Sequence, residues 1–308
     1  MRIVVLGAGA GGGFPQWNSA LPAAQRARSG DPVARPATQC SLAVSATGDR
    51  WVLLDAAPDV RAQIEATPSL HPRRPPRSSP IDAVVLSSAD IDHIAGLLSL
   101  RERHAFAIYA TGRVHRVLAA NAVFDTLDRH LVPRRSLPLE EAVELKDARG
   151  DALGLRLIAF PVPGKVPLYL EQSDDPLGLH GTEPEDVVGL HLSDGERGFF
   201  YIPGCAALPP PLAERLREAA LVFFDATLWR DDELVACGAG SKTGRRMGHM
   251  SVGGPEGTLA ALAGLGIARK VCIHMNDSNP LLLADSAERR EAEAAGWTIA
   301  YDGMELEL

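Results

Sequence analysis

The sequence predicts an α/β protein built as a four-layer αβ/βα sandwich, in which two sheets pack between two layers of helices. Apolar segments typical of buried strands come first and helical patterns follow, and the same order is repeated in the second half of the chain. Several predicted strands end in an acidic residue or a histidine, and α/β folds place their chemistry at such ends. With 308 residues, 46% of them hydrophobic, the chain can bury a substantial core.

The first half of the chain carries strand patterns followed by helical ones. Two segments rich in proline and arginine, residues 19–38 and Pro68–Pro80, are expected to form loops, the first of them a loop or lid. Strands are predicted at Arg2–Leu6, Ser41–Val44, Trp51–Leu54 and Ala83–Leu86. Helices are predicted at Ile94–Arg103, Arg113–His130 and Leu139–Leu145.

Strand patterns resume after Gly150, and helices again follow them. Strands are predicted at Leu153–Pro161, Val166–Glu171, Val187–Leu192, Gly198–Ile202, Ala220–Phe224 and Lys270–His274. Helices are predicted at Leu212–Ala219 and Pro255–Leu265. Asp225 and His274 stand at the polar ends of the last two strands.

Composition and charge argue against several classes of function. The net charge of −8 disfavours nucleic acid as a partner, because binding a polyanion needs a basic face. No apolar segment approaches the ~18 residues that a membrane span requires. The four cysteines are scattered without a Cys-x-x-Cys pair, which favours a reducing cytoplasm over a disulfide scaffold.

The glycine run after the first strand matches the Gly-x-Gly-x-x-Gly pattern of dinucleotide-binding proteins. The match covers Gly7–Gly12, but Gly13–Asn18 is a poor start for a helix. No acidic residue at a strand end follows ~20 positions later to bind a ribose hydroxyl. We therefore expect the glycines to let the backbone approach a neighbouring loop or a substrate, with Trp17 near the site.

Two strand ends carry residues that can bind a metal. Asp90, Asp92 and His93 directly follow an apolar strand, and His274 ends the last predicted strand. Aspartate before a helix is also a common N-cap, which accounts for one of the two carboxylates, and a histidine at a strand end is often structural. Metal binding explains Asp92 and His93 together, whereas for Asp90 both roles, metal ligand and N-cap, are left open.

These segments resemble the metal-binding loops of the metallo-β-lactamase superfamily, whose usual first loop reads Thr-His-x-His-x-Asp-His. Asp92 and His93 match its last two ligands, and the resemblance makes His274 the histidine that completes their site. The resemblance also implies that the superfamily's other metal site is lost. Different residues stand at four of its ligand positions, namely Ser88, Asp90, Gly164–Lys165 and Cys205.

Asp225 and His249 resemble a catalytic pair of the phosphodiesterase and tRNA-processing branch. In that branch an acidic-Ala-Thr segment precedes a Gly-His-x-Ser segment, as Asp225–Thr227 precedes Gly248–Ser251 here. The resemblance implies that Asp225 orients His249 for catalysis, since carboxylates commonly fix the tautomer of a histidine. The alternative is a histidine without a catalytic role in the mobile glycine-rich loop at Gly238–Gly248.

Motifs along the whole chain resemble those of the coenzyme PQQ synthesis protein B family. They are Gly7–Asn18, Ser87–His93, Phe199–Ala206, Gly248–Ser251 and His274–Pro280. The resemblance implies a single metallo-β-lactamase-like domain over residues 1–308 and a role in the biosynthesis of pyrroloquinoline quinone (PQQ). It further implies an iron- and oxygen-dependent hydroxylation of the tyrosine ring in a crosslinked Glu-Tyr intermediate.

The surviving ligand set independently agrees with oxidative chemistry. His93, His274 and Asp92 supply two imidazoles and one carboxylate, the ligand class of non-haem Fe(II) oxygenases. Fe(II) is therefore the expected cofactor, although the same residue types bind zinc, so zinc is an alternative in the protein as purified. His249 could then take the phenolic proton of the substrate as a general base.

A substrate derived from glutamate and tyrosine carries carboxylates, and basic residues are the candidates that would bind them. Lys165 and Arg245–Arg246 could serve in this way, and surface solubility is the alternative explanation of each charge. Asn276, two residues after His274, joins Trp17 as a further substrate-binding candidate. Beyond this small peptide-derived substrate, other PQQ biosynthesis proteins are candidate partners, and a homo-oligomer is left open.

Two other functions stay open. A mononuclear metal-dependent phosphodiesterase or hydrolase would use His249 and Asp225 in the same roles, but it should retain the histidines replaced at Ser88 and Asp90. A non-enzymatic carrier or transport protein for PQQ would need no ordered metal site. Metal bound after purification would therefore argue against the carrier.

Overall fold

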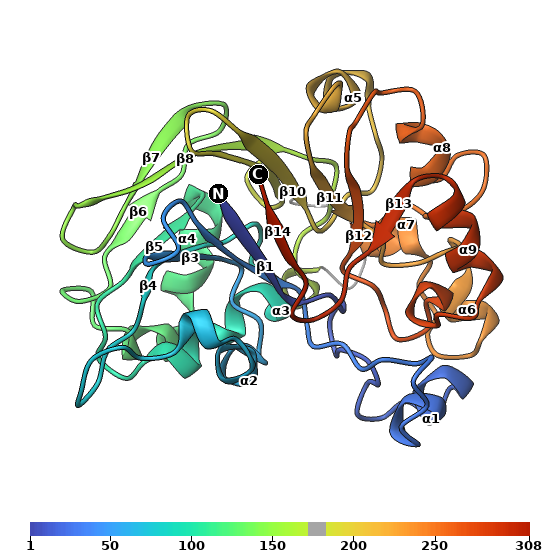
Figure 1. Ribbon diagram of the computed structural model, residues 1–308, viewed down its shortest axis with the longest axis horizontal. Helices are drawn as coiled ribbons and strands as arrows, with labels where there is room; N and C mark the ends of the chain where they lie inside the picture. The colour runs from blue at the N-terminus through green and yellow to red at the C-terminus, as the bar shows by residue number, and fades with distance from the viewer. Residues whose placement is uncertain (172–182) are drawn as a thin grey trace.

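The structure is a computed structural model of the chain and describes residues 1–171 and 183–308. Within these residues, two seven-stranded sheets pack against each other and helices cover their outer faces (Figure 1). The predicted α/β sandwich is therefore confirmed. Both chain ends meet in the first sheet, where the N-terminal strand pairs with the C-terminal one.

The first sheet comes mainly from the N-terminal half of the chain. Its strands are β1 (Arg2–Gly7), β2 (Ser41–Ser45), β3 (Trp51–Leu54), β4 (Ile81–Val85), β5 (Ala107–Ala110), β6 (Arg134–Ser136) and β14 (Glu305–Glu307). They are ordered β14-β1-β2-β3-β4-β5-β6. The pairs from β3 to β6 are parallel, and the others are antiparallel.

The second sheet comes from the C-terminal half and has the same plan. Its strands are β7 (Ala142–Lys146), β8 (Ala152–Pro161), β9 (Val188–Ser193), β10 (Gly198–Ile202), β11 (Val222–Asp225), β12 (Lys270–Ile273) and β13 (Trp297–Ile299). They are ordered β13-β12-β11-β10-β9-β8-β7. The pairs from β10 to β13 are parallel, and the remaining pairs are antiparallel.

Short helices connect and cover these strands. The α-helices are α1 (Pro22–Arg28), α2 (Val60–Ala66), α3 (Ile91–Ile94), α4 (Gly112–Ala120), α5 (Pro210–Leu216), α6 (Glu233–Ala236), α7 (Gly244–Met247), α8 (Thr258–Leu262) and α9 (Ala287–Ala294). Short 3₁₀-helices are η1 (Pro68–Leu70), η2 (Ala95–Leu100), η3 (Ala122–Thr126), η4 (Leu168–Leu170) and η5 (Pro280–Leu282). In the described part of the chain, no helix combines the length and apolar character needed to cross a membrane.

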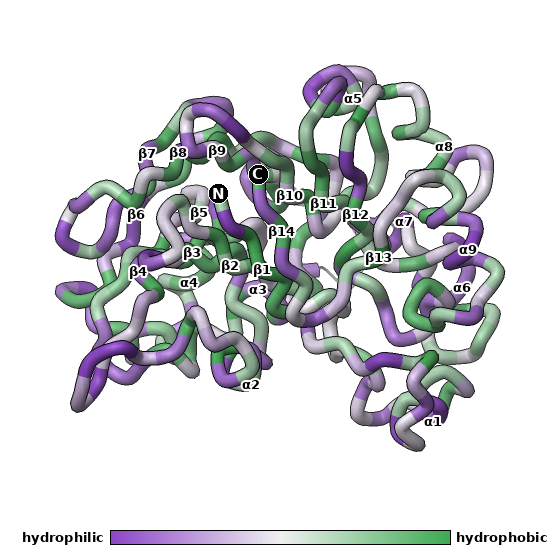
Figure 2. The backbone as a smooth tube through the Cα atoms, in the orientation of Figure 1, coloured by the Kyte–Doolittle hydropathy of each residue, from purple (hydrophilic) through white to green (hydrophobic). Residues whose placement is uncertain are grey.

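Alternation of side chains along the strands divides the core. Ile3 and Val5 of β1 join the large buried cluster that also contains Leu190 of the second sheet, so this cluster lies between the sheets. Val4 of β1 points the other way, into the cluster that contains Val114 of α4. Figure 2 shows the hydrophobic segments concentrated along the strands and the hydrophilic ones along outer loops. Burial of apolar surface on both faces of the first sheet therefore holds the layers together.

Three predicted elements are wrong. Leu139–Leu145 is not a helix, because residues 142–146 form strand β7 and pair with β8. Val166–Glu171 contains the 3₁₀ turn η4 rather than a strand, and Pro167 before that turn cannot donate to a ladder of hydrogen bonds. Residues 19–38 contain helix α1, which begins at Pro22, a residue well suited to a first helical position.

Other predicted elements differ in their bounds or were not foreseen. The helix expected at Ile94–Arg103 begins at Ile91 as α3 and continues as η2. The helix expected at Arg113–His130 ends at Ala120 and is followed by η3. Elements that the sequence did not indicate include α2, α6, α7, α9, β5, β6, β13 and β14.

Candidate metal centre

The parallel strands of both sheets end around a cavity of about 370 Å³. Asp55 follows β3, and the loop that begins at Ser87 follows β4. From the second sheet, Asp225 ends β11 and His274 follows β12. Carboxyl ends of parallel strands commonly carry the functional side chains of α/β folds. The cavity wall includes Asp90, Asp92, His93, Thr227, His249 and His274.

The loop after β4 is fixed by close contact between two backbones. Asp92 and His93 lie in helix α3. The N–H of Ala56 donates to the carbonyl of His93, and the N–H of Gly96 donates to the carbonyl of Ala56, each at 2.8 Å. A Cβ at Gly96 would lie 2.1 Å from the carbonyl oxygen of Ala57, so this approach requires glycine. The end of β3 therefore holds the loop in position.

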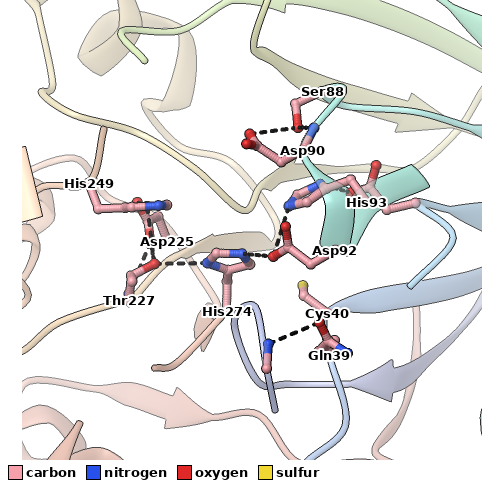
Figure 3. A network of polar contacts seen from close by, with 12 residues as sticks. Gln39, Cys40, Ser88, Asp90, Asp92, His93, Asp225, Thr227, His249 and His274 are labelled. Atoms are coloured by element: carbon pink, nitrogen blue, oxygen red, sulfur yellow. Dashed lines mark hydrogen bonds and ion pairs between the residues drawn. The ribbon is translucent and has the colours of Figure 1, made fainter. Parts of the chain in front are cut away.

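Asp92, His93 and His274 converge as metal ligands would (Figure 3). Oδ2 of Asp92 lies 3.1 Å from Nε2 of His274 and 3.8 Å from Nε2 of His93. The centroids of the two imidazole rings are 5.5 Å apart. Two atoms that each bind the same ion at ~2.1 Å lie at most ~4.2 Å apart. The donor types and the two distances from Asp92 to the histidines therefore fit one shared metal ion.

Asp55 fixes which ring nitrogen of His93 faces the cavity. Oδ2 of Asp55 lies 2.9 Å from Nδ1 of His93, and the same oxygen accepts hydrogen bonds from Ser87 at 2.8 Å and from Tyr201 at 2.9 Å. This bond assigns the Nδ1 proton, so the Nε2 lone pair of His93 is left for a metal. Burial alone would lower the pKa of His93, but the carboxylates of Asp55 and Asp92 outweigh it and raise the pKa to about 10.

Replacing Asp55 by asparagine should weaken metal binding without removing a ligand. The variant keeps the shape of the side chain but loses the charge that supports His93, and outer contacts of this kind are worth ~10–100-fold in metal affinity. Zn²⁺ titration against a chelator measures the change. Asp151→Asn, at an exposed aspartate, is the matched control. Equal affinities of Asp55→Asn and the control would show that Asp55 does not support the site.

Metal binding should strengthen as the pH rises. Because the pKa of His93 is about 10 in the metal-free protein, the ring is protonated at neutral pH and a metal must displace that proton. The apparent Kd for Zn²⁺ should fall ~10-fold per pH unit between pH ~6 and ~8 for each proton displaced. Calorimetric titrations at three pH values measure the slope. A Kd that is independent of pH would contradict the protonated state of the histidine.

His274 is held by Thr227. The hydroxyl of Thr227 donates to Oδ1 of Asp225 at 2.7 Å, so it accepts from Nδ1 of His274 at 2.8 Å. This assignment again leaves an Nε2 lone pair facing the cavity. Both Asp55 and His274 adopt left-handed backbone angles, with φ of 61° and 63°. Such residues cost ~1–3 kcal/mol and concentrate at functional sites, and here both follow strand ends, His274 in the cavity wall and Asp55 buried behind His93.

Asp225 and His249 lie in direct contact, as their predicted pairing requires. Nδ1 of His249 is 2.7 Å from Oδ2 of Asp225, and its ring stacks on His274 with centroids 5.3 Å apart. Burial lowers the pKa of His249, but the neighbouring Asp225 carboxylate outweighs this and raises it. The raised pKa makes His249 a stronger proton acceptor at the cavity wall.

A second group of potential ligand atoms comes from Asp225, His249 and His274. Hydrogen bonds already join its members through Thr227, which lies 3.0 Å from Nδ1 of His249 and 2.8 Å from Nδ1 of His274. Asp225 also accepts from the backbone N–H groups of Cys205 and Thr227. The arrangement thus satisfies its own polar atoms and fits an acid–base pair better than a second metal.

Asp90 stands apart from the other three predicted metal ligands. It occupies the N-cap position of α3 but its side chain makes no capping hydrogen bond. Its carboxylate accepts instead from the hydroxyl of Ser88 at 3.2 Å. Burial, and then the nearby Asp92 carboxylate, raise the pKa of Asp90. The structure therefore places Asp90 in the cavity wall but does not bring it into the group of Asp92, His93 and His274.

The remaining altered ligand positions also lie at or beside the cavity. Ser88, Gly164 and Lys165 line it. Cys205 is buried, and its thiol donates to the carbonyl of Ala207. Burial, followed by the charge of Asp225, raises the pKa of Cys205 to about 12, so the thiol stays neutral and is a poor metal ligand.

The predicted substrate-binding residues divide into two groups. Lys165 and Asn276 line the cavity. Trp17 is 86% exposed and is not among the described residues of the cavity wall. Arg245 is also absent from the described wall, and its side chain forms a 2.7 Å ion pair with Glu256. The structure thus corrects the placement of Trp17 and Arg245, because both side chains extend towards solvent.

Sequence reasoning missed several residues of the site. Asp55 and Thr227 were visible as polar residues after apolar strands, but nothing in the sequence indicated which histidines they contact. The expected close approach of the glycine run is found, since Gly9 bridges to Gln39 and Met275, and Gly11 lines the cavity beside Asp92. Tyr201 lies within the Phe199–Ala206 motif, but nothing in the sequence indicated its contact with Asp55, and the cavity residue Lys242 had no sequence signal.

Known proteins resemble this chain in sequence and fold. Residues 50–275 match the family described as "Beta-lactamase superfamily domain". The chain is 52% identical to coenzyme PQQ synthesis protein B of Gluconacetobacter diazotrophicus over 304 residues, covering 99% of this chain and 98% of that protein.

Solved structures agree with this relationship. The zinc-bound PqqB of Methylobacterium extorquens is 44% identical, with a TM-score of 0.94 and full coverage of both chains. A diphosphatase of the PhnP family, 22% identical with a TM-score of 0.70 over 100% of this chain and 98% of that one, shares the fold. From the similarity over its full length, this chain belongs to the coenzyme PQQ synthesis protein B family of the β-lactamase superfamily.

Proposed function

We propose that this protein acts in PQQ biosynthesis as a non-haem iron oxygenase that hydroxylates the tyrosine ring of a crosslinked Glu-Tyr intermediate. The observation that carries the proposal is the convergence of Asp92, His93 and His274 at a cavity lined by His249. Membership of the coenzyme PQQ synthesis protein B family supports the biosynthetic role. The volume of about 370 Å³ lies in the usual range of small-molecule sites.

The ligand set supports Fe(II) as the working metal. Two imidazoles and one carboxylate leave coordination positions open, and activation of dioxygen is the chemistry that Fe(II) supplies in such sites. Zinc binds the same donor types, and a solved relative is described as zinc-bound. We therefore expect zinc to occupy the same ligands and to yield an inactive protein.

The residues of this chain supply the rest of the chemistry. His249, oriented by Asp225 at 2.7 Å, is placed to take the phenolic proton and return it to the product. The Nδ1 contacts of His93 and His274 hold both rings still while the substrate binds. Ala10 and Gly11 form part of the cavity wall, and Gly11 lies beside Asp92 without adding a side chain.

The proposal is tested by loading the protein with Fe(II) without oxygen and then adding a crosslinked Glu-Tyr peptide, oxygen and ascorbate. Hydroxylation consumes two electrons per oxygen atom inserted, which ascorbate provides, and mass spectrometry should show added oxygen only with Fe(II). The zinc-loaded and metal-free proteins are the controls. Protein that reaches one equivalent of bound iron but leaves the peptide mass unchanged would contradict the oxygenase.

A metal-dependent hydrolase is the second candidate, and the Asp225–His249 contact is the observation that favours it. Phosphodiester hydrolysis commonly relies on two metals held ~3.5–4 Å apart. Here the second group of ligand atoms is joined by hydrogen bonds through Thr227. Release of nitrophenol from bis(nitrophenyl) phosphate by the zinc-loaded protein would support the hydrolase, and retention of the ester would count against it.

A further inference from the structure

Three cations surround one carboxylate near the wall of the cavity. Oε2 of Glu171 lies 2.8 Å from Nζ of Lys242 and 2.9 Å from Nη2 of Arg246. Its other oxygen, Oε1, lies 3.1 Å from Nζ of Lys165. The Glu171 side chain is only 9% exposed and that of Lys165 only 14%. These four residues, the Glu171 cluster, combine three positive charges with one negative charge.

Lys165 and Lys242 together carry more positive charge than the Glu171 carboxylate that they contact can balance. Burial would raise the pKa of Glu171, but hydrogen bonds from Lys242, Arg246 and Lys165 outweigh it and lower the pKa to about 2, so Glu171 is ionised at neutral pH. Within residues 1–171 and 183–308, Lys165 and Lys242 form no ion pair with any other carboxylate. The cations of the cluster already contact one carboxylate, so a carboxylate is the chemical group that suits them.

The Glu171 cluster is continuous with the catalytic candidates. Lys165 and Lys242 both line the cavity that His249 and His274 line. A Cβ at Gly248 would lie 3.1 Å from Cγ of Lys165, so the lysine stem runs directly beside the residue that precedes His249. The cavity therefore combines a group of metal-ligand candidates with a pair of lysines whose ammonium groups contact the same carboxylate.

We propose that Lys165 and Lys242, held together by Glu171, form a subsite for a carboxylate of the substrate. The proposal rests on the proposed function, because it assigns which end of a Glu-Tyr-derived substrate lies away from the metal ligands. A carboxylate at the two lysines would orient the phenol ring towards His249 and the metal ligands, so the subsite selects acidic substrates over their amides. Glu171 is a positioning residue that keeps the two ammonium groups convergent.

Calorimetry on zinc-loaded protein without oxygen tests the subsite with two probes, the dipeptide Glu-Tyr and its analogue without carboxylates, Gln-Tyr-amide. Wild-type protein should bind Glu-Tyr about 10-fold or more tightly than the amide, since hydrogen bonds to charged groups contribute at this level. Lys165→Met and Lys242→Met should each remove most of that difference while zinc content and affinity for the amide stay unchanged. Arg245→Met is the matched control, because Arg245 is 67% exposed and pairs with Glu256.

Equal binding of Glu-Tyr and its amide to wild-type protein would overturn the subsite. Lysine variants that keep the full preference for Glu-Tyr would also overturn it. If inorganic phosphate displaced Glu-Tyr at a lower concentration than succinate does, the subsite would be a phosphate site instead. These measurements need no turnover. Failure of oxygen insertion with the binding preference intact would therefore reject the proposed function alone, and hydroxylation without the preference would reject the subsite alone.

Discussion

Replacement of His93 or His274 by alanine should abolish tight metal binding and turnover together. Each ring places Nε2 within 3.8 Å of the Asp92 carboxylate, and each has Nδ1 occupied by a protein acceptor. Contacts outside the ligand shell are worth ~10–100-fold in metal affinity, so removal of a ligand itself should cost more than ~100-fold. Metal analysis after loading with excess Fe(II) should give about one equivalent for wild-type protein and none for either variant.

His130→Ala, at an exposed histidine, controls for the loss of an imidazole as such. Both site histidines are buried, so circular dichroism and thermal unfolding should confirm that the alanine variants are folded. The conservative change Asp92→Asn tests whether the carboxylate of Asp92 binds the same ion as the two histidines. A folded His93→Ala protein that still binds one equivalent of iron tightly would remove His93 from the ligand set. Two tightly held equivalents in wild-type protein would contradict the single-metal site.

His249→Ala should leave the metal bound but slow turnover by ~10²–10⁴-fold, the usual contribution of a general acid or base. The physical reason is that His249 contacts Asp225 and Thr227 rather than Asp92, so the ligand group keeps its own contacts. Iron content and steady-state rates on the crosslinked Glu-Tyr peptide measure the two effects separately. The variant should also lose the part of the pH–rate profile that reports the histidine.

Other outcomes would reassign His249. A His249→Ala protein that loses its iron would make the residue a ligand, which its place in the second group of potential ligand atoms allows. Full activity with iron bound would leave it without a role in proton transfer. His191→Ala is a suitable control, because His191 stacks on Phe200 and is not among the described residues of the cavity wall.

The sequence could predict the metal loop because its information is local. Asp92 and His93 are adjacent in the chain, follow an apolar strand and match a known pattern, so the prediction needed no tertiary contact. His274 could be found for the same reason at the end of β12. Asp55 could not be assigned, since its contact with His93 spans 38 positions and depends on β3 and β4 pairing in parallel register.

The sequence could not predict the contacts of side chains whose direction depends on helix phase or on irregular backbone. Arg245 and Arg246 are equivalent in the sequence, but neighbouring residues of a helix point ~100° apart, so Arg246 contacts Glu171 while Arg245 faces solvent. The pattern of Val166–Glu171 predicted a strand because its apolar residues alternate. Its proline instead favours a turn, which delivers Glu171 to three cations.

Isotope labelling with ¹⁸O₂ tests the central claim most directly. Protein loaded anaerobically with one equivalent of Fe(II) would receive the crosslinked Glu-Tyr peptide and ascorbate, then ¹⁸O₂ in ordinary water, and the product would be analysed by mass spectrometry. The account predicts ¹⁸O on the tyrosine ring, with none from zinc-loaded protein or from His274→Ala. An unmodified ring, or oxygen derived only from water, would contradict an oxygenase built on Asp92, His93 and His274.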